Sequence, residues 1–126
     1  MLLDTSVVVA ALRRAPGLKE RLREAEETML PLVALGELEY GVNLSAPRER
    51  QQAAVQAFLA STSLLLSTAK TAAEYGRIKA ALKAAGTPLP ENDVWIAAYA
   101  MEHGLPLATR DTHFKQVPGL TVLDWR

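Results

Sequence analysis

The chain has 126 residues, of which 49% are hydrophobic and 22% charged, and this is a usual size for one compact domain. It contains no cysteine, which excludes disulfide frameworks, thiolate zinc sites and cysteine nucleophiles, and leaves carboxylates as the only metal-binding side chains present in number. The 14 basic and 14 acidic residues cancel, so the formal charge gives no sign of a DNA-binding module. We therefore expect a single domain over residues 1–126.

Short apolar runs alternate along the chain with longer segments of helical periodicity, which is the rhythm of βαβ units. The predicted helices end at suitable residues, since Gly86 and Gly104 stand where glycine caps belong. The order of elements predicts an α/β fold on a parallel sheet of about five short strands. The predicted strands cover residues 2–3, 28–30, 63–66, 106–108 and 121–123, and the predicted helices cover residues 6–14, 18–27, 33–44, 48–59, 71–85 and 93–103.

The last predicted helix differs from the others because residues 94–101 have no polar face. A helix that is apolar all round is buried on most sides, so we expect it at the centre of the fold. Trp95, Tyr99 and Met101 lie in this helix and are expected to pack in the core, with stacking on a substrate base as the alternative for Trp95.

No apolar run approaches the roughly 20 residues that a membrane-spanning helix needs. The first basic residues, Arg13 and Arg14, follow the apolar run at the amino end, whereas a signal peptide carries its basic residues before that run. We therefore expect a cytoplasmic protein that has no membrane partner.

Four carboxylates are predicted to meet at one edge of the sheet. Asp4 and Asp111 follow predicted strands, and the carboxyl ends of parallel strands share the edge at which ligands usually bind. Asp93 begins the buried helix, whose first turn would lie beside them. Glu37 has small or apolar neighbours one helical turn away, which favours an inward direction. Glu39 has similar neighbours, so periodicity alone separates the two glutamates poorly.

Carboxylates gathered in one pocket repel each other, and such a cluster persists mainly where a hard divalent cation neutralises it. Mg²⁺ or Mn²⁺ is the natural occupant of an oxygen-only site, because such sites leave ligand positions for substrate phosphate. Such an ion activates water for attack on phosphorus, which indicates phosphodiester hydrolysis. With the four carboxylates set aside, basic residues outnumber acidic ones by 14 to 10, so a nucleic-acid substrate is compatible with the charge.

Each of these residues also has a simpler interpretation. The three aspartates stand where helix N-caps belong, and Glu37 alone would suit a solvated helix face. Only the joint placement of the four at one edge indicates catalysis. His103 and His113 each lack a second histidine at ligand spacing, and we expect neither to act in metal binding or acid–base chemistry.

Four segments of the sequence, in chain order, resemble the motifs of the PIN-domain family. They are LDTSV at residues 3–7, ELEYGV at 37–42, NDVWIAA at 92–98 and LATRD at 107–111. The segment HFKQVPGL at residues 113–120, with the Asp124–Trp125 pair, resembles the end of VapC-type toxins in particular. The resemblance covers the whole chain, and four motifs at domain-wide spacing are more specific than any one of them.

The resemblance implies a three-layer α/β/α fold and an Mg²⁺- or Mn²⁺-dependent endoribonuclease, the toxin of a type II toxin–antitoxin pair. It also implies a homodimer that acts on RNA and is inhibited by a cognate antitoxin. It selects Glu37 over Glu39. By position it makes Asp4, Glu37, Asp93 and Asp111 the catalytic and metal-binding quartet, with Asp4 and Asp93 as direct ligands and Thr5, Ser6 and Thr109 as supporting hydroxyls. Thr112 and His113 stand where many relatives carry a further acidic residue, so a fifth acidic ligand is not expected.

Three other interpretations fit an acidic pocket on a parallel sheet. A phosphoacceptor domain needs an aspartate after its central strand, and we expect residues 63–66, followed by Ser67 and Thr68, to form that strand. A phosphatase of the haloacid type would want a second aspartate where Ser6 stands. A catalytically silent domain of the same fold is compatible with every motif. Metal-dependent cleavage of RNA separates these alternatives, and the sequence does not reveal which RNA is cut.

Overall fold

The computed structural model describes all 126 residues and contains a five-stranded sheet in which every strand pair is parallel. The strand order across the sheet is β3-β2-β1-β4-β5. The strands are β1 (Leu2–Leu3), β2 (Met29–Pro31), β3 (Ser63–Leu65), β4 (Leu107–Thr109) and β5 (Val122–Asp124). The predicted α/β class and the parallel sheet of short strands are confirmed.

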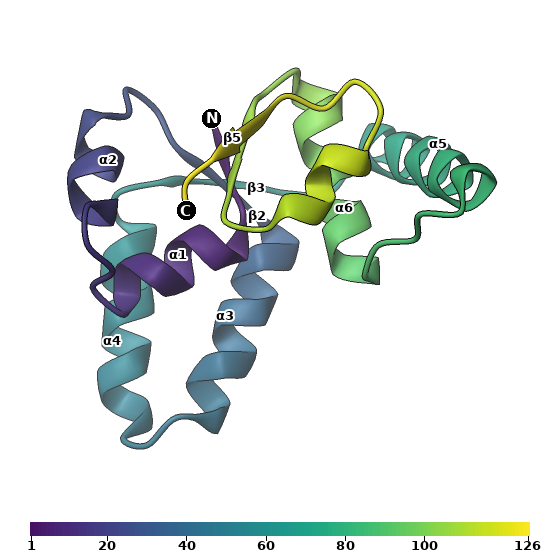
Figure 1. Ribbon diagram of the computed structural model, residues 1–126. Coiled ribbons are helices and arrows are strands. Elements are labelled where there is room, and N and C mark those ends of the chain that lie inside the picture. The colour runs from purple at the N-terminus through teal and green to yellow at the C-terminus, as the bar shows by residue number, and fades with distance from the viewer.

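Six α-helices and one 3₁₀ helix surround the sheet, and α3 and α4 extend together away from it (Figure 1). They are α1 (Thr5–Leu12), α2 (Leu18–Glu24), α3 (Leu32–Leu44), α4 (Arg48–Leu59), α5 (Ala69–Ala85), α6 (Glu91–His103) and η1 (Thr112–Gln116). None of these helices has the length and apolar composition needed to cross a bilayer. The predicted helices thus all exist, whereas η1 was not predicted.

The sheet separates two hydrophobic cores, because successive residues of a strand point to opposite faces. Leu2 belongs to the core that contains α5 and α6, and Leu3 belongs to the core that contains α1 to α4. Their partners across the strand pair follow the same division, with Leu107 beside Leu2 and Ala108 beside Leu3. The fold therefore has the three α/β/α layers expected from the resemblance.

One part of the predicted topology is wrong. Residues 63–66 were expected to form the central strand, but β3 lies at the edge of the sheet and β1 lies at the centre. The run Leu64–Leu66 is apolar enough for a buried strand, yet Leu64 is 40% exposed and Leu66 is 61% exposed. Hydrophobic runs predict strands but not their order, because the order depends on how the connecting helices cross over the sheet.

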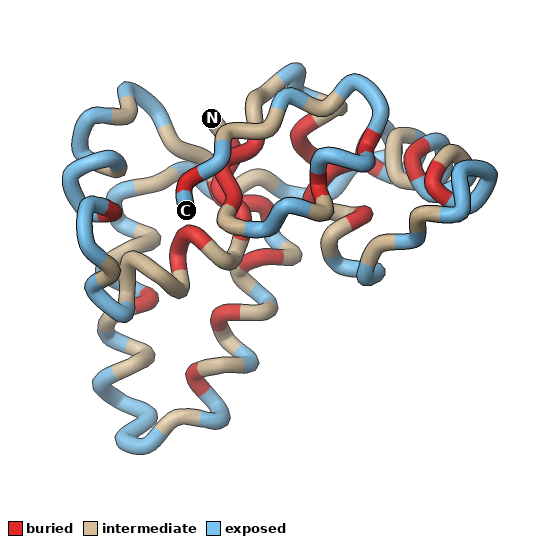
Figure 2. The backbone as a smooth tube through the Cα atoms, viewed as in Figure 1, coloured by how far each residue is buried: buried red, intermediate tan, exposed pale blue.

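The α6 helix is buried through most of its length, as its apolar sequence predicts (Figure 2). It begins at Glu91, two residues before the predicted start, with Pro90 at the N-cap, and ends at His103, after which Gly104 caps it in the left-handed conformation. Tyr99 is fully buried within it. Trp95 is only partly buried and belongs to neither core, so the prediction of core packing is wrong for this residue.

The two cores give a direct test of how burial stabilises this chain. We expect Leu30→Ala to lower the free energy of unfolding by about 2 to 5 kcal/mol, because Leu30 on β2 is fully buried and its truncation leaves a cavity. The same truncation at the exposed Leu66 should change it by less than about 0.5 kcal/mol. Urea denaturation of both variants measures the difference. Equal losses in the two variants would contradict the described packing.

Candidate active site

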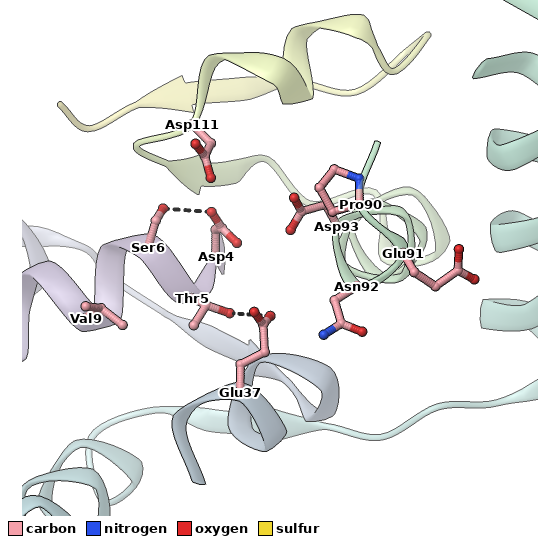
Figure 3. A pocket seen from close by; sticks show the side chains of 10 residues that line it. All are labelled: Asp4, Thr5, Ser6, Val9, Glu37, Pro90, Glu91, Asn92, Asp93 and Asp111. Carbon is pink, nitrogen blue, oxygen red and sulfur yellow. Dashed lines mark hydrogen bonds between the residues drawn. The ribbon is translucent and has the colours of Figure 1, made fainter. Parts of the chain in front are cut away.

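A pocket of about 500 Å³ opens at the carboxyl ends of β1 and β4 (Figure 3). Its side chains come from the start of α1, from α3 and from the first turn of α6, with Asp111 after β4. Five of its residues are acidic and none is basic. The lining residues are Asp4, Thr5, Ser6, Val9, Glu37, Pro90, Glu91, Asn92, Asp93 and Asp111.

Asp4 lies at the base of this pocket and is only 2% exposed. Its Oδ2 atom accepts hydrogen bonds from Ser6 Oγ and from Thr109 Oγ1, each at 2.7 Å. These hydroxyls are themselves held, because Ser6 Oγ accepts from the Arg110 backbone amide at 3.1 Å and Thr109 Oγ1 accepts from the Asp111 amide at 3.0 Å. No hydrogen bond reaches Asp4 Oδ1, which is left available to the pocket (Figure 3).

Glu37 enters the pocket from α3. Its Oε1 atom accepts a hydrogen bond from Thr5 Oγ1 at 2.9 Å. Glu39, two residues further along the helix, instead accepts a hydrogen bond from Gln52 on α4 at 3.2 Å. A separation of two residues turns a helix by more than half a revolution, so only one of these glutamates can face the pocket. The structure thus separates Glu37 from Glu39, which periodicity alone did not.

Asp93 and Asp111 face each other across the pocket, with His113 of η1 between them. His113 Nε2 lies 2.8 Å from Asp93 Oδ2, and His113 Nδ1 lies 3.8 Å from Asp111 Oδ1. One potential ligand atom from each of these three residues falls within 4.8 Å of the others, a spacing that can hold a metal ion.

The sequence interpretation left His113 out of the site. His113 is 20 residues from Asp93 in the sequence, and β4 lies between them. The spacing of the two residues therefore does not predict that their side chains meet. The one available signal was its position two residues after Asp111. His103, in contrast, lies in the last turn of α6, 3.5 Å from Glu102, and does not line the pocket.

None of the three aspartates acts as a helix cap through its side chain. Asp4 and Asp111 occupy N-cap positions of α1 and η1, but their carboxylates make no capping hydrogen bond. Asp93 lies within the first turn of α6, after the N-cap residue Pro90. The simpler interpretation of these residues as caps therefore does not account for their geometry.

Burial raises the pKa of both Glu37 and Asp93 above the ordinary values of 4.5 and 3.8. The hydrogen bonds from Thr5 and His113 act in the opposite direction. The negative charges of neighbouring carboxylates add to the rise, with Asp4 acting on both residues. The cluster is thus a set of mutually repelling oxygen donors that no lysine or arginine neutralises, which fits the requirements of a hard divalent cation.

The fifth acidic residue of the pocket lies outside this cluster. The Glu91 carboxylate turns away from the other four (Figure 3). It pairs with Lys79 Nζ at 2.9 Å and accepts a hydrogen bond from the Tyr75 hydroxyl. A neutralised carboxylate has little need of a cation, so we do not include Glu91 among the candidate metal ligands. Asn92, beside it, brings an uncharged amide to the pocket wall.

A parallel sheet with helices on both faces and a carboxylate pocket at its strand ends defines an α/β protein whose site suits a divalent cation. The chain belongs to the PIN domain family, whose model matches residues 1–120. It is 33% identical to ribonuclease VapC2 of Haemophilus influenzae, over 98% of this chain and 96% of that protein. The predicted resemblance to the VapC type is confirmed.

Two solved structures show the same fold. Structural superposition on VapBC2 from Rickettsia felis, bound to a DNA fragment from its promoter, gives a TM-score of 0.94 at 27% identity, covering 99% of this chain and 98% of that one. VapBC-5 from Mycobacterium tuberculosis, a member of the VapBC family of toxin–antitoxin systems, gives a TM-score of 0.77 at 29% identity, covering 99% and 96%.

The raised pKa values of Glu37 and Asp93 predict how the stability of the metal-free protein depends on pH. Between the ordinary and the raised pKa, the folded state binds more protons than the unfolded state, so the free energy of unfolding falls as pH rises through that window. Asp93→Asn removes one titrating group and should flatten this fall. Urea unfolding in chelator at a series of pH values measures it.

Glu39→Gln is the matched control, because Glu39 lies on the same helix as Glu37 but outside the pocket. It should keep the pH dependence of the wild type. An Asp93→Asn variant whose stability falls with pH as steeply as that of the wild type would show that the pKa of Asp93 is not raised in the folded protein.

Proposed function

We propose that this chain is a metal-dependent endoribonuclease that hydrolyses RNA phosphodiester bonds and serves as the toxin of a type II toxin–antitoxin pair. We further propose that residues 1–126 form one PIN domain. The observation that carries the proposal is the convergence of four carboxylates, from four separate segments of the chain, in a pocket without a basic side chain. The 33% identity to a protein named ribonuclease VapC2 supplies the substrate class.

In this proposal the acidic quartet of Asp4, Glu37, Asp93 and Asp111 holds Mg²⁺ or Mn²⁺. When bound, the ion would neutralise the phosphate and activate water for attack on phosphorus. Asp4 is suited to direct coordination, because its Oδ2 atom is occupied by two hydroxyls while Oδ1 is not. Asp93 offers a second oxygen, since His113 contacts only Oδ2.

The hydroxyl residues would serve the reaction by fixing these carboxylates. Ser6 and Thr109 hold Asp4 from both sides, and Thr5 holds Glu37 by its Oε1 atom. Glu37 Oε2 accepts no hydrogen bond, so it can orient a water molecule or accept a proton from it. No lysine or arginine lines the pocket, so the bound ion would supply positive charge for the phosphate.

The phosphoacceptor and the catalytically silent domain are less well supported. The sequence argument against a phosphoacceptor was that no aspartate follows the central strand. That argument is wrong, because the central strand is β1 and Asp4 follows it. The comparisons argue against a phosphoacceptor instead, because the chain belongs to the PIN domain family and is 33% identical to a protein named ribonuclease VapC2. A catalytically silent domain would have no need to keep four unneutralised carboxylates in one pocket.

Metal-dependent cleavage tests the proposal. We expect the purified protein to cut RNA in Mg²⁺ or Mn²⁺ and to stop in excess EDTA. Asp4→Asn and Asp93→Asn should each lower the cleavage rate by about 100-fold or more, because each removes a charge that holds the ion. Glu39→Gln should leave the rate within a few-fold of the wild type, since Glu39 bonds Gln52 outside the pocket. The rates are measured on a labelled RNA under single-turnover conditions.

Two results would count against the proposal. Full activity in excess EDTA would exclude a metal-dependent mechanism. An inactive Glu39→Gln variant together with an active Glu37→Gln variant would show that the wrong glutamate has been assigned to the site.

We also propose that the chain forms a homodimer and binds a cognate antitoxin that closes the acidic pocket. The similarity to VapBC structures supports an antitoxin partner. Large apolar side chains exposed on α3, Tyr40 at 68% and Leu44 at 70%, supply surface that association would cover. Sedimentation equilibrium at micromolar concentration should give twice the chain mass of 13.7 kDa. A strictly monomeric species would contradict the dimer.

A further inference from the structure

His113 contacts the acidic quartet but has no role of its own in the proposed function. Its Nε2 atom lies 2.8 Å from Asp93 Oδ2, and this is the one side-chain hydrogen bond that Asp93 makes. An ionised carboxylate can only accept, so His113 Nε2 carries the hydrogen and donates it. The side chains of Asp93 and His113 are 15% and 29% exposed, so water competes little for the contact.

This contact repeats an arrangement found at two other carboxylates of the pocket. Asp4 has Oδ2 held by two hydroxyls, and Glu37 has Oε1 held by Thr5, while the second oxygen of each accepts no hydrogen bond. At Asp93, His113 holds Oδ2 and no hydrogen bond reaches Oδ1. Each of these three acids thus has one oxygen fixed by a side-chain donor and one oxygen available to a cation.

The segment that carries His113 is itself anchored on both sides. Phe114, the next residue of η1, is fully buried in the core that contains α5 and α6, and its ring centroid lies 5.0 Å from that of the imidazole. Before η1, the Asp111 backbone amide donates to Thr109 Oγ1. An imidazole on an anchored segment can hold a carboxylate in one orientation, which a freely moving side chain cannot do.

The contact is specific to Asp93 among the two acids that His113 lies between. His113 Nδ1 is 3.8 Å from Asp111 Oδ1, which is beyond hydrogen-bond distance, and the Asp111 side chain is 51% exposed. The imidazole therefore orients the more buried of the two carboxylates. Partners that hold a metal-ligating side chain in this way fix its orientation and strengthen binding of the metal.

We infer that His113 is a positioning residue, which orients Asp93 toward the divalent cation by donating a hydrogen bond from Nε2 to Asp93 Oδ2. The inference rests on the proposed metal-dependent function and adds a residue to its site. In this role the imidazole binds the carboxylate and not the ion. An amide donor at the same place can therefore replace it.

Binding of Mn²⁺ to the RNA-free protein tests the role. Electron paramagnetic resonance of the free ion gives the affinity. His113→Leu removes the donor and should lower the Mn²⁺ affinity by about 10- to 100-fold. His113→Gln restores an amide donor near the position of Nε2 and should bind Mn²⁺ nearly as tightly as the wild type. His103→Gln is the matched control and should leave the affinity unchanged, because His103 lies beside Glu102 outside the pocket.

Two further measurements separate positioning from the other roles that His113 could have. Thermal melts in EDTA show which variants are folded, and His113→Asn, whose amide stops short of the Nε2 position, replaces a His113→Leu variant that does not fold. Electron spin echo modulation of bound Mn²⁺ detects nitrogen attached directly to the ion, and we expect no such nitrogen in the wild type. A directly bound nitrogen that disappears in His113→Gln makes His113 a metal ligand and overturns the positioning role.

The outcomes distinguish this inference from the proposed function. Unchanged Mn²⁺ affinity of the folded variant without the donor overturns the positioning role and leaves the ribonuclease proposal standing, as does an equal loss of affinity in His113→Gln. The expected affinities in a protein that cuts no RNA support the positioning role and overturn the ribonuclease. A wild-type protein that binds no Mn²⁺ overturns both.

Discussion

The site depends first on the two hydrogen bonds that Asp4 Oδ2 accepts from Ser6 and Thr109. A buried carboxylate is costly unless its charge is met by donors, and here one oxygen receives two hydroxyl donors at 2.7 Å. The donors come from α1 and from the end of β4, so the contact also joins the central strand to its neighbour. The same two hydroxyl oxygens accept hydrogen bonds from the backbone amides of Arg110 and Asp111. The contacts that hold the Asp4 carboxylate therefore also position the segment that carries Asp111.

The remaining carboxylates meet around Asp4 at an electrostatic cost. Burial and mutual repulsion raise the pKa of Glu37 and Asp93, the hydrogen bond from His113 acts against the rise at Asp93, and no lysine or arginine lines the pocket. Glu91 differs from these residues, because its carboxylate contacts Lys79 and the Tyr75 hydroxyl and lies outside the cluster. The contrast between a neutralised and an unneutralised carboxylate within one pocket is the physical reason to regard the quartet as a cation site.

The sequence predicted the elements better than their arrangement. Alternating apolar runs and helical segments located five strands and six helices, since both periodicities are local. The position of β3 at the edge could not be found in this way, because Leu64–Leu66 is as apolar as a central strand. The placement of Asp4 and Asp111 at the strand ends follows directly from strand direction in a parallel sheet.

Within the site, the residues that sequence reasoning missed are those that tertiary contacts bring in. His113 reaches Asp93 only because η1 folds back after β4, and no spacing rule contains that turn. Outside the pocket, Trp95 was expected in the core because it lies in an apolar run, yet it stacks on Tyr75 of the neighbouring helix α5 and belongs to neither core. Glu37 and Glu39 have similar neighbours in sequence, and only the packing of α3 against α4 separates them.

We propose that Asp93 belongs to a repelling cluster of carboxylates that a divalent cation stabilises. Thermal melts of the wild type and Asp93→Asn near neutral pH, in EDTA and in Mg²⁺, test it most directly. Loss of one charge should make Asp93→Asn melt higher than the wild type in EDTA, and it should gain less from Mg²⁺, because a cation that binds only the folded state stabilises it by mass action. An Asp93→Asn variant that melts lower than the wild type in EDTA and responds to Mg²⁺ as the wild type does would contradict the account and make Asp93 a structural residue of α6.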